Sequence, residues 1–135
     1  MRSLKEILEQ VHTIAVVGCS DRPWRDSHRI ASFLQDQGYK VYPVNPTLET
    51  VLGMKCYPTV ASIPEKVDLV DVFRRPEFVP DVVDDAIAAG ASVLWLQLGI
   101  THPEAEERAR AAGMEVVADH CIAVEYRLAG VRRGS

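Results

Sequence analysis

The sequence predicts an α/β domain built on a parallel sheet of about five strands, with helices on both faces. Apolar strand patterns alternate with amphipathic helical patterns and start about 22–28 residues apart, which is the period of a right-handed strand–helix–strand unit. Three predicted helices end at Gly38, Gly90 and Gly113, and an apolar strand follows each glycine within two residues. The pattern therefore predicts a Rossmann-like three-layer α/β/α architecture, with residues 1–135 as a single domain.

Each strand is predicted from a short apolar run. The runs in chain order are Ile14–Val17, Lys40–Val44, Asp68–Phe73, Ser92–Gln97 and Glu115–Ala118, with a small additional strand at Met54–Tyr57. Most of these runs are apolar on both faces, as expected of buried parallel strands. Pro43 cannot donate a ladder hydrogen bond, so it marks the end of its strand or an edge of the sheet.

The helices are predicted from apolar spacing and from capping signals. Ser3 and Glu6 have capping-box spacing ahead of a helix over residues 4–11, and Thr101 and Glu104 repeat that spacing. Either Asp26 or Ser27 is expected to cap the second helix. The remaining predicted segments are a helical turn at Thr59–Ile63, helices at about 76–89 and 120–128, and a fraying tail at Gly130–Ser135.

Three helices are assigned inward faces from the same spacing. In the helix that ends at Gly38 these residues are Ile30, Phe33 and Leu34. In the helix at about 76–89 these residues are Val79, Val83, Ala86 and Ile87. In the last helix, Cys121, Val124 and Leu128 are expected to share the buried face.

Composition limits the classes of function. Hydrophobic residues make up 47% and charged residues 25% of the chain, which is typical of a globular protein. The net charge of −4 argues against general nucleic-acid binding. The three cysteines are widely spaced and fit reduced thiols better than a disulfide framework or a zinc motif. The N-terminus has no signal-peptide pattern and no run is apolar enough to cross a membrane, so a cytoplasmic location is expected.

The loop after the first strand has the composition of an anion site. It reads Gly18-Cys-Ser-Asp-Arg-Pro-Trp-Arg-Asp-Ser27-His28 and leads into a helix. Glycine permits a tight turn, and a helix N-terminus presents free N–H groups to an anion. Ser20 and Ser27 offer hydroxyl donors, and nearby arginines offer bidentate partners for phosphate. The alternative is a plain polar loop whose serine only caps the helix.

The loop does not match two common nucleotide motifs. It has one glycine instead of the three of G-x-G-x-x-G, and the second strand runs into Asn45-Pro46-Thr47 where a dinucleotide site places an acidic residue. No G-K-[ST] phosphate loop occurs in the chain. The sequence therefore predicts a phosphate-bearing ligand other than NAD or a hydrolysable nucleotide.

Two further clusters are expected at the same edge of the sheet. Phe73-Arg74-Arg75-Pro76 follows the third strand, and Gln97-Leu98-Gly99 follows the fourth. Cations at a helix start oppose the helix dipole, so the arginines are expected to bind an external anion, although they could also be ordinary surface residues. Phe73 offers a flat face for a base or, equally well, a core contact.

Evidence for catalysis is limited to the run Asp119-His120-Cys121. Adjacent helical residues point in different directions, so these three cannot form one relay. The favoured interpretation is an aspartate that caps the last helix, with Cys121 on its core face. No Ser-His-Asp set, metal cluster or carboxylate pair occurs at recognisable spacing.

Five segments in one order resemble the stand-alone coenzyme A-binding domain proteins, which are relatives of the N-terminal domain of succinyl-CoA ligase α subunits. The segments are IAVVGCSDRPWRDSHRI, VYPVNP, IPEKVDLVDVFRRPE, VLWLQLGI and VVADHCIAVEYRL, and the resemblance spans Leu4–Leu128. It implies that the first loop binds the phosphates of CoA and that the next two loops flank its 3′-phospho-ADP portion. The binding residues implied are Gly18, Cys19, Ser20, Arg25, Ser27, His28, Asn45, Pro46, Thr47, Phe73, Arg74 and Arg75, with Gln97 and Gly99 as the floor.

The sequence departs from this family at three positions. Cys19 stands where members often have a small apolar residue, and His120 and Tyr126 stand where the closing motif commonly has arginine and histidine. The phosphorylated histidine of the ligases lies in a domain outside this sequence, so the resemblance does not imply ligase activity.

The leading hypothesis is a non-catalytic protein that binds CoA or an acyl-CoA, with no nucleic-acid or membrane partner. The alternatives are an enzyme that acts on an acyl-CoA thioester through Cys121 or His120, and an NAD(P)-binding domain. The sequence leaves open the acyl group, the purpose of binding, any protein partner and the oligomeric state.

Overall fold

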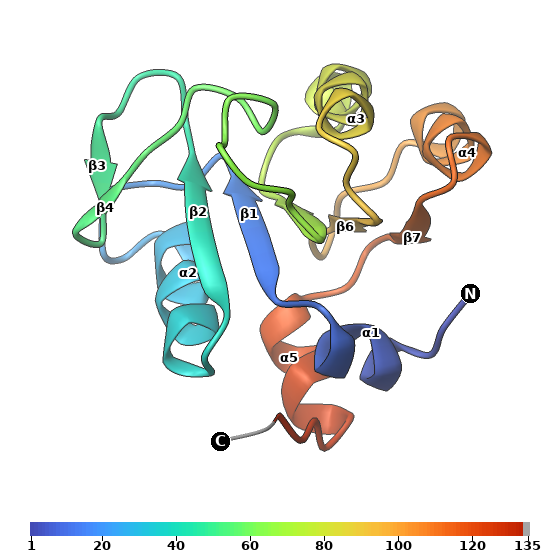
Figure 1. Cartoon of the computed structure of the whole chain (residues 1–135), viewed down its shortest axis with the longest axis horizontal. Helices are drawn as coiled ribbons and strands as arrows, with labels where there is room; N and C mark the ends of the chain where they lie inside the picture. The colour runs from blue at the N-terminus through green and yellow to red at the C-terminus, as the bar shows by residue number, and fades with distance from the viewer. Residues whose placement is uncertain (134–135) are drawn as a thin grey trace.

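A parallel five-stranded sheet forms the centre of the protein, in the spatial order β2-β1-β5-β6-β7 (Figure 1). The structure is a computed structural model that describes residues 1–133. The strands of the sheet are β1 (Thr13–Val17), β2 (Lys40–Val44), β5 (Leu69–Val72), β6 (Val93–Leu96) and β7 (Glu115–Val117). All four strand pairings are parallel, so the predicted Rossmann-like α/β fold is confirmed. The strand β2 lies at an edge, as Pro43 requires.

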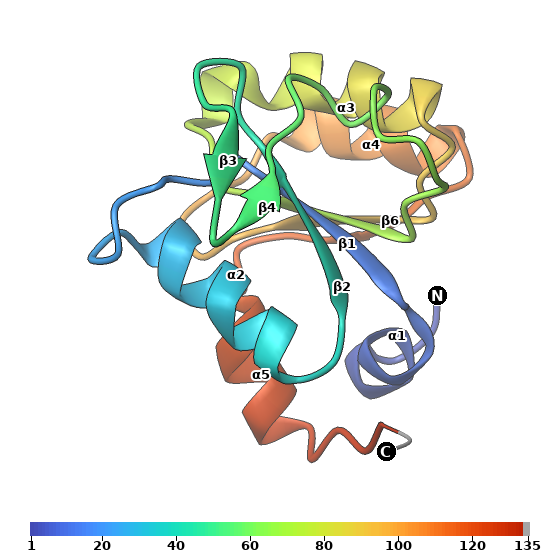
Figure 2. The same ribbon diagram turned by 60° about the vertical axis from the view of Figure 1, so that its left-hand side comes forward.

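Helices cover both faces of the sheet (Figure 2). On one face lie α3 (Val79–Ala88), which follows a short 3₁₀ helix η1 (Pro76–Phe78), and α4 (Pro103–Ala111). On the other face lie α1 (Leu4–Gln10), α2 (Asp26–Asp36) and α5 (Ile122–Leu128). This arrangement gives the three predicted layers.

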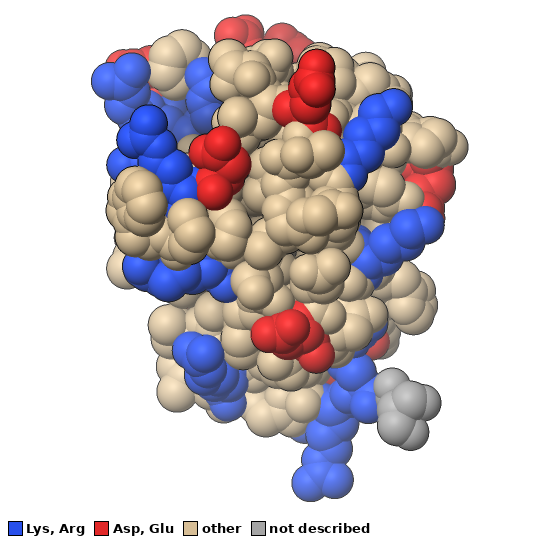
Figure 3. Space-filling view, turned by 90° about the vertical axis from the view of Figure 1, so that its left-hand side faces the viewer, with Lys and Arg blue, Asp and Glu red and all other residues tan. Residues whose placement is uncertain are grey.

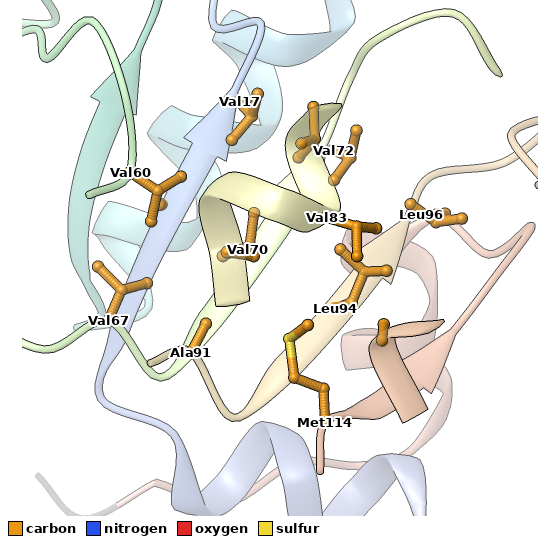
Figure 4. Packing of buried hydrophobic residues seen from close by; sticks show 14 of the residues in the cluster. Val17, Val60, Val67, Val70, Val72, Val83, Ala91, Leu94, Leu96 and Met114 are labelled. Atoms are coloured by element: carbon orange, nitrogen blue, oxygen red, sulfur yellow. The ribbon is translucent and has the colours of Figure 1, made fainter. Parts of the chain in front are cut away.

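Side chains alternate between the two faces along each strand and form two cores. Ala15 and Val17 of β1 pack toward α3 and α4, whereas Ile14 and Val16 pack toward the other three helices. Figure 4 shows part of the first core, in which valines of the central strands meet Leu94, Leu96 and Met114. Because both faces are covered, the strands are mostly buried and mostly apolar, as the sequence indicated.

One central position is not apolar. Asp71 of β5 is fully buried, and neither of its carboxylate oxygens has a hydrogen-bond partner among the described residues. Burial raises the pKa of this carboxyl well above its usual range, because the charged form cannot be solvated there. The neutral acid is therefore favoured in the folded protein.

The segment between β2 and β5 differs from its predicted form. Instead of one strand at Met54–Tyr57, a two-stranded hairpin forms from β3 (Thr50–Val51) and β4 (Met54–Lys55). Tyr57 contributes only an isolated bridge to Val44. The predicted helical turn at Thr59–Ile63 is an irregular turn in which the Ile63 amide donates to the Val60 carbonyl.

The caps predicted for α2 and α4 are wrong. Arg25, not Asp26 or Ser27, occupies the N-cap position of α2, and no side chain caps this helix. The helix α4 starts two residues later than Thr101, because His102 is its cap: His102 Nδ1 accepts a hydrogen bond from the Ala105 amide. Glu106, one turn on, accepts from the His102 amide with Oε2. The cap predicted for α1 at Ser3 and Glu6 is confirmed.

The predicted inward faces need correction in two helices. Ile122 and Ala123 are the buried residues of α5, whereas Val124 is 45% exposed and Leu128 is 77% exposed. In α3, Ile87 is exposed, and Val82 is buried in its place. Both helices start later than the sequence pattern indicates, at Val79 and at Ile122.

The chain returns to α1 at its C-terminal end. The Arg132 amide donates to the Glu9 carboxylate, and Arg133 donates to the Val11 carbonyl and lies over the Tyr39 ring. Residues 134–135 of the tail predicted to fray lie outside the described residues. Within residues 1–133, no helix is long and apolar enough to span a membrane.

The buried carboxyl of Asp71 should make stability depend on pH. Above about pH 4, where an aspartate of the unfolded chain ionises, the unfolded chain loses a proton that the folded chain keeps. The free energy of unfolding should therefore fall as pH rises, until the buried carboxyl itself ionises. Asp71→Asn removes this titration. The difference in urea midpoint between this variant and the natural protein should grow in favour of the variant with increasing pH.

The matched control is Asp36→Asn, at an exposed position at the end of α2. Its difference from the natural protein should stay nearly flat over the same pH range. A pH-independent difference for Asp71→Asn would contradict a neutral buried carboxyl.

Candidate functional site

The candidate site lies at the carboxyl ends of β1 and β5, where the strand order changes direction. Neighbouring connections leave the sheet on opposite faces at this point, which opens a crevice in folds of this type. Gly18 ends β1 with φ +83°, and Phe73 follows β5. A Cβ atom on Gly18 would lie 2.4 Å from the Phe73 carbonyl oxygen. The crevice therefore depends on glycine both for its backbone conformation and for space.

The first loop is held by the end of β2. The backbone amides of Gly18 and Cys19 both donate to the Val44 carbonyl, at 2.9 and 3.3 Å. These two amides are therefore occupied. The Cys19 side chain is fully buried, and burial raises the pKa of its thiol to about 12. Cys19 thus supports the loop from inside the core, and its side chain does not line the crevice.

The N-terminus of α2 faces a hollow of about 450 Å³ in this loop. The Ser27 hydroxyl accepts a hydrogen bond from the Ser20 amide at 3.0 Å, which closes the loop onto the helix. No side chain caps α2, and the His28 amide donates to the Arg25 carbonyl, so the amides of Asp26 and Ser27 are the ones that remain available to an anion. The hollow is lined by Gly18, Ser20, Trp24, Arg25, Asp26, Ser27 and Phe73.

The arginines of this loop and of α2 differ in whether their guanidinium groups already form hydrogen bonds or ion pairs. Arg29 pairs with Asp26 and donates to the Trp24 carbonyl, so its guanidinium is already engaged. Arg25 lines the hollow, and its guanidinium has no hydrogen bond or ion pair among residues 1–133. Figure 3 shows Lys and Arg side chains along the left edge of one face, the side on which Figure 2 shows the loop between β1 and α2. His28 is half-buried and does not line the hollow.

The residues after β2 mainly hold the two loops together. The side-chain amide nitrogen of Asn45 donates to the Cys19 carbonyl at 3.1 Å, and Asn45 Oδ1 accepts from the backbone amide and the hydroxyl of Thr47. Both side chains are thus engaged within the protein. Pro46 lines a second hollow of about 280 Å³, whose other walls include Gly18, Arg74, Phe78 and Asp81.

The residues after β5 divide the crevice. Arg74 is half-buried, lies over the Phe78 ring at 4.3 Å and forms no ion pair within the described chain. Arg75 is more exposed and pairs with Glu77 at 3.3 Å. Phe73 packs partly into the core and also lines two of the hollows. Of these two arginines, only Arg75 is in an ion pair within the described chain, so the charge of Arg74 is the less compensated one.

The residues after β6 connect the crevice to α5. Gln97 is 5% exposed, and its Oε1 accepts a hydrogen bond from the Ile122 amide at 3.2 Å. The Gly99 amide donates to Asp119 Oδ1 at 2.6 Å. Asp119 therefore holds the β6 loop and does not cap α5, contrary to the prediction, and Cys121 occupies the N-cap position instead.

The largest hollow, about 640 Å³, lies between the β5 and β6 loops and the helices α2 and α5. The three hollows adjoin: Gly18 lines the first two, Arg74 lines the second and third, and Phe73 lines the first and third. Nine residues predicted for the site line at least one hollow: Gly18, Ser20, Arg25, Ser27, Pro46, Phe73, Arg74, Arg75 and Gln97. Cys19, His28, Asn45, Thr47 and Gly99 do not.

Sequence reasoning missed one wall of the largest hollow. Helical spacing assigns Ile30 and Phe33 to the core and Cys121 and Val124 to a buried helix face, yet all four line this hollow. Arg127 also lines it and lies over the Phe33 ring. Apolar helical spacing indicates a covered face, but it does not say whether the cover is protein or an open hollow.

Tyr126, one of the positions where the sequence departs from the family pattern, has a packing role. Its ring lies edge-on against the rings of Phe33 and Tyr39. Tyr126 therefore joins α5 to α2 beside the largest hollow.

The strand order and the polar crevice place the protein among Rossmann-like α/β domains with a site at the strand crossover. Residues 12–127 match the family described as CoA binding domain, and the chain belongs to this family. No group of three His, Cys, Asp or Glu side chains suited to a metal ion occurs in the described part of the chain.

Similar proteins fall into two groups. The chain is 42% identical over 123 residues to the uncharacterized protein YneT of Bacillus subtilis, covering 91% of each. A solved structure of a hypothetical protein from Pyrococcus horikoshii has a TM-score of 0.90 at 42% identity, with 93% of this chain and 88% of that chain covered. The α subunit of acetate–CoA ligase (ADP-forming) II from Pyrococcus furiosus is 30% identical, and the match spans 82% of this chain but 27% of that subunit.

Substitution of Gly18 tests the close approach at the crevice. Gly18→Ala meets both the positive φ and the Phe73 carbonyl, whereas Gly90→Ala meets a positive φ with nothing within 4 Å. We expect Gly90→Ala to lower the free energy of unfolding by about 1–2 kcal/mol. Gly18→Ala should lower it by about 1–3 kcal/mol more, because the backbone must shift. Equal losses in urea unfolding would contradict the packing argument.

Proposed function

We propose that the protein binds coenzyme A or an acyl-CoA along the three adjoining hollows and does so without a turnover step. The observation that carries the proposal is the change in character along the crevice. The hollow at the N-terminus of α2 is mainly polar and combines uncapped helix amides with Arg25. In the largest hollow, apolar residues such as Ile30, Leu98 and Val124 form most of the wall, and arginines, Arg74 among them, lie at its border. CoA likewise has a phosphorylated nucleotide at one end and a long, weakly polar arm at the other.

The proposed orientation follows from these contacts. The diphosphate would bind at the N-terminus of α2, where open amides and Arg25 provide donors. The adenine nucleotide would lie in the hollow beside Pro46, with Arg74 and Phe78 as its charged and flat walls. The pantetheine arm would then enter the largest hollow toward Gln97. The family membership and the similarity to ligases named for CoA support this assignment.

An NAD(P) ligand fits the loop after β2 less well. Dinucleotide domains place an acidic side chain at the end of this strand to bind the ribose hydroxyls. Here the position is taken by Asn45, whose side chain is engaged with Cys19 and Thr47. We therefore keep NAD as the competing ligand in the test.

The lack of a nucleophile–base pair at Cys121 supports binding over turnover. In the described chain the Cys121 thiol has no hydrogen-bond partner, and His120 Nδ1 lies 2.7 Å from the Ala118 carbonyl oxygen. Covalent catalysis requires a base within hydrogen-bond reach of the nucleophile. Neither Cys121 nor His120 meets this condition.

Calorimetric titration tests the proposed ligand. CoA should bind with a measurable heat, 3′-dephospho-CoA should bind more weakly, and NAD should not displace CoA at equal concentration. Saturating CoA that produces neither heat nor a rise in melting temperature would refute the proposal.

Substitution of Arg74 tests the proposed orientation. Arg74→Gln should weaken CoA binding by about 1.5–3 kcal/mol, or about 10- to 150-fold in Kd, through loss of a charge-assisted hydrogen bond. The matched control is Arg110→Gln, which removes the same charge from α4, remote from the three hollows. Unchanged affinity for Arg74→Gln, or equal losses for both variants, would contradict the assigned orientation.

A further inference from the structure

The largest hollow contains a thiol that the proposed binding function does not use. Cys121 lines this hollow, is half-buried and has no hydrogen-bond partner in residues 1–133. It stands at the N-cap of α5, where its side chain does not cap the helix. Since it neither belongs to the two cores nor supports the helix end, its thiol is left facing the hollow.

A second polar side chain, that of Gln97, lies in the wall of the same hollow. Gln97 lines the hollow although it is almost completely buried, and only its Oε1 is engaged, by the Ile122 amide. Its amide nitrogen donates to no group of the described chain and is not itself fully buried, so it is accessible from the hollow. Ile122 directly follows Cys121, so the unused donor and the thiol lie on one short stretch of wall. A buried amide with a free donor is suited to a carbonyl of a bound ligand, such as the pantetheine amides.

The other two cysteines differ from Cys121 in their surroundings. Cys19 and Cys56 are buried and line none of the three hollows. Burial raises the pKa of both thiols, which disfavours the thiolate that would react. The natural protein therefore has one thiol accessible to a ligand and two internal controls.

We propose that Cys121 captures the sulfur end of the bound ligand as a mixed disulfide, by exchange with the disulfide of coenzyme A. The inference rests on the proposed function, because it needs the nucleotide end in the two smaller hollows near Gly18 and the sulfur end beside Gln97. The protein then holds the thiol form of CoA without a covalent bond and forms a covalent adduct with the disulfide form. The oxidation state of the ligand decides which of the two complexes is present.

The exchange is balanced without a further oxidant. The Cys121 thiolate attacks one sulfur of the CoA disulfide, the Cys121–CoA disulfide bond forms and the original sulfur–sulfur bond breaks. The second CoA leaves as a thiolate and takes up the proton that Cys121 lost. Cys121 and one CoA sulfur form the new disulfide, and the other CoA sulfur is reduced. A thiol reductant reverses the reaction and restores Cys121.

Intact-mass spectrometry of the full chain tests the proposal. With CoA disulfide, the mass should increase by one CoA less two hydrogens, peptide mapping should place the adduct on Cys121, and reductant should remove it. Cys121→Ser should give no adduct, whereas Cys56→Ser should react like the natural protein. Because binding brings the sulfurs together, the rate with CoA disulfide should exceed that with glutathione disulfide by about tenfold or more.

Two further measurements separate the failure of this inference from that of the proposed function. Arg74→Gln should slow the reaction with CoA disulfide and leave that with glutathione disulfide unchanged. If CoA binds in calorimetry but CoA disulfide leaves Cys121 unmodified, or reacts no faster than glutathione disulfide, covalent capture is refuted and binding stands. If CoA does not bind at all, both proposals are refuted.

Discussion

The close approach between Gly18 and the Phe73 carbonyl is the constraint on which the crevice depends. It sets the distance between the ends of β1 and β5, and the Cδ atom of Arg74 lies almost as near, 3.1 Å from the position a Cβ would take on Gly18. A larger residue at position 18 would push apart the strands that carry the first loop and the two arginines. The first loop, Phe73 and Arg74 are therefore positioned by one contact, and the adjoining hollows meet around it.

The polar side chains of the site have two separate roles. Asn45, Ser27, Gln97 and Asp119 form hydrogen bonds that fasten the loops to one another or to α2 and α5. The guanidinium groups of Arg25 and Arg74 form no hydrogen bond or ion pair in the described chain, although Arg74 lies over the Phe78 ring. A loop that is already fastened loses less conformational entropy when a ligand binds, so under the proposed function these scaffold residues would contribute to affinity without touching the ligand.

Charge is distributed unevenly over this acidic chain. The net charge is −4, yet the three hollows are lined by five arginines against three aspartates, beside the uncapped amides of α2. One carboxyl, Asp71, lies in the core behind this region, and burial favours its neutral form, which spares the crevice a negative charge. The electrostatic character of the site thus follows from local placement and not from composition.

The sequence alone predicted the main strands of the sheet, their parallel arrangement and the main loop of the candidate site. Strand periodicity, the glycines that end helices and the run from Gly18 to His28 are local patterns, and local patterns follow from backbone sterics and side-chain spacing. The residues after β1, β2 and β5 could be predicted to meet because parallel strands end at one edge. Their hydrogen bonds could not, since Asn45 and Gln97 find their partners in segments far along the chain.

Only the tertiary structure decided which apolar face is covered. Val124 and Leu128 have the spacing of core residues, but in the register that the structure shows Ile122 and Ala123 are buried instead, and Gln97 accepts from the Ile122 amide. The same register leaves Cys121 facing the largest hollow. The register of a short helix depends on a few capping bonds, and those bonds exist only once distant strands are in place.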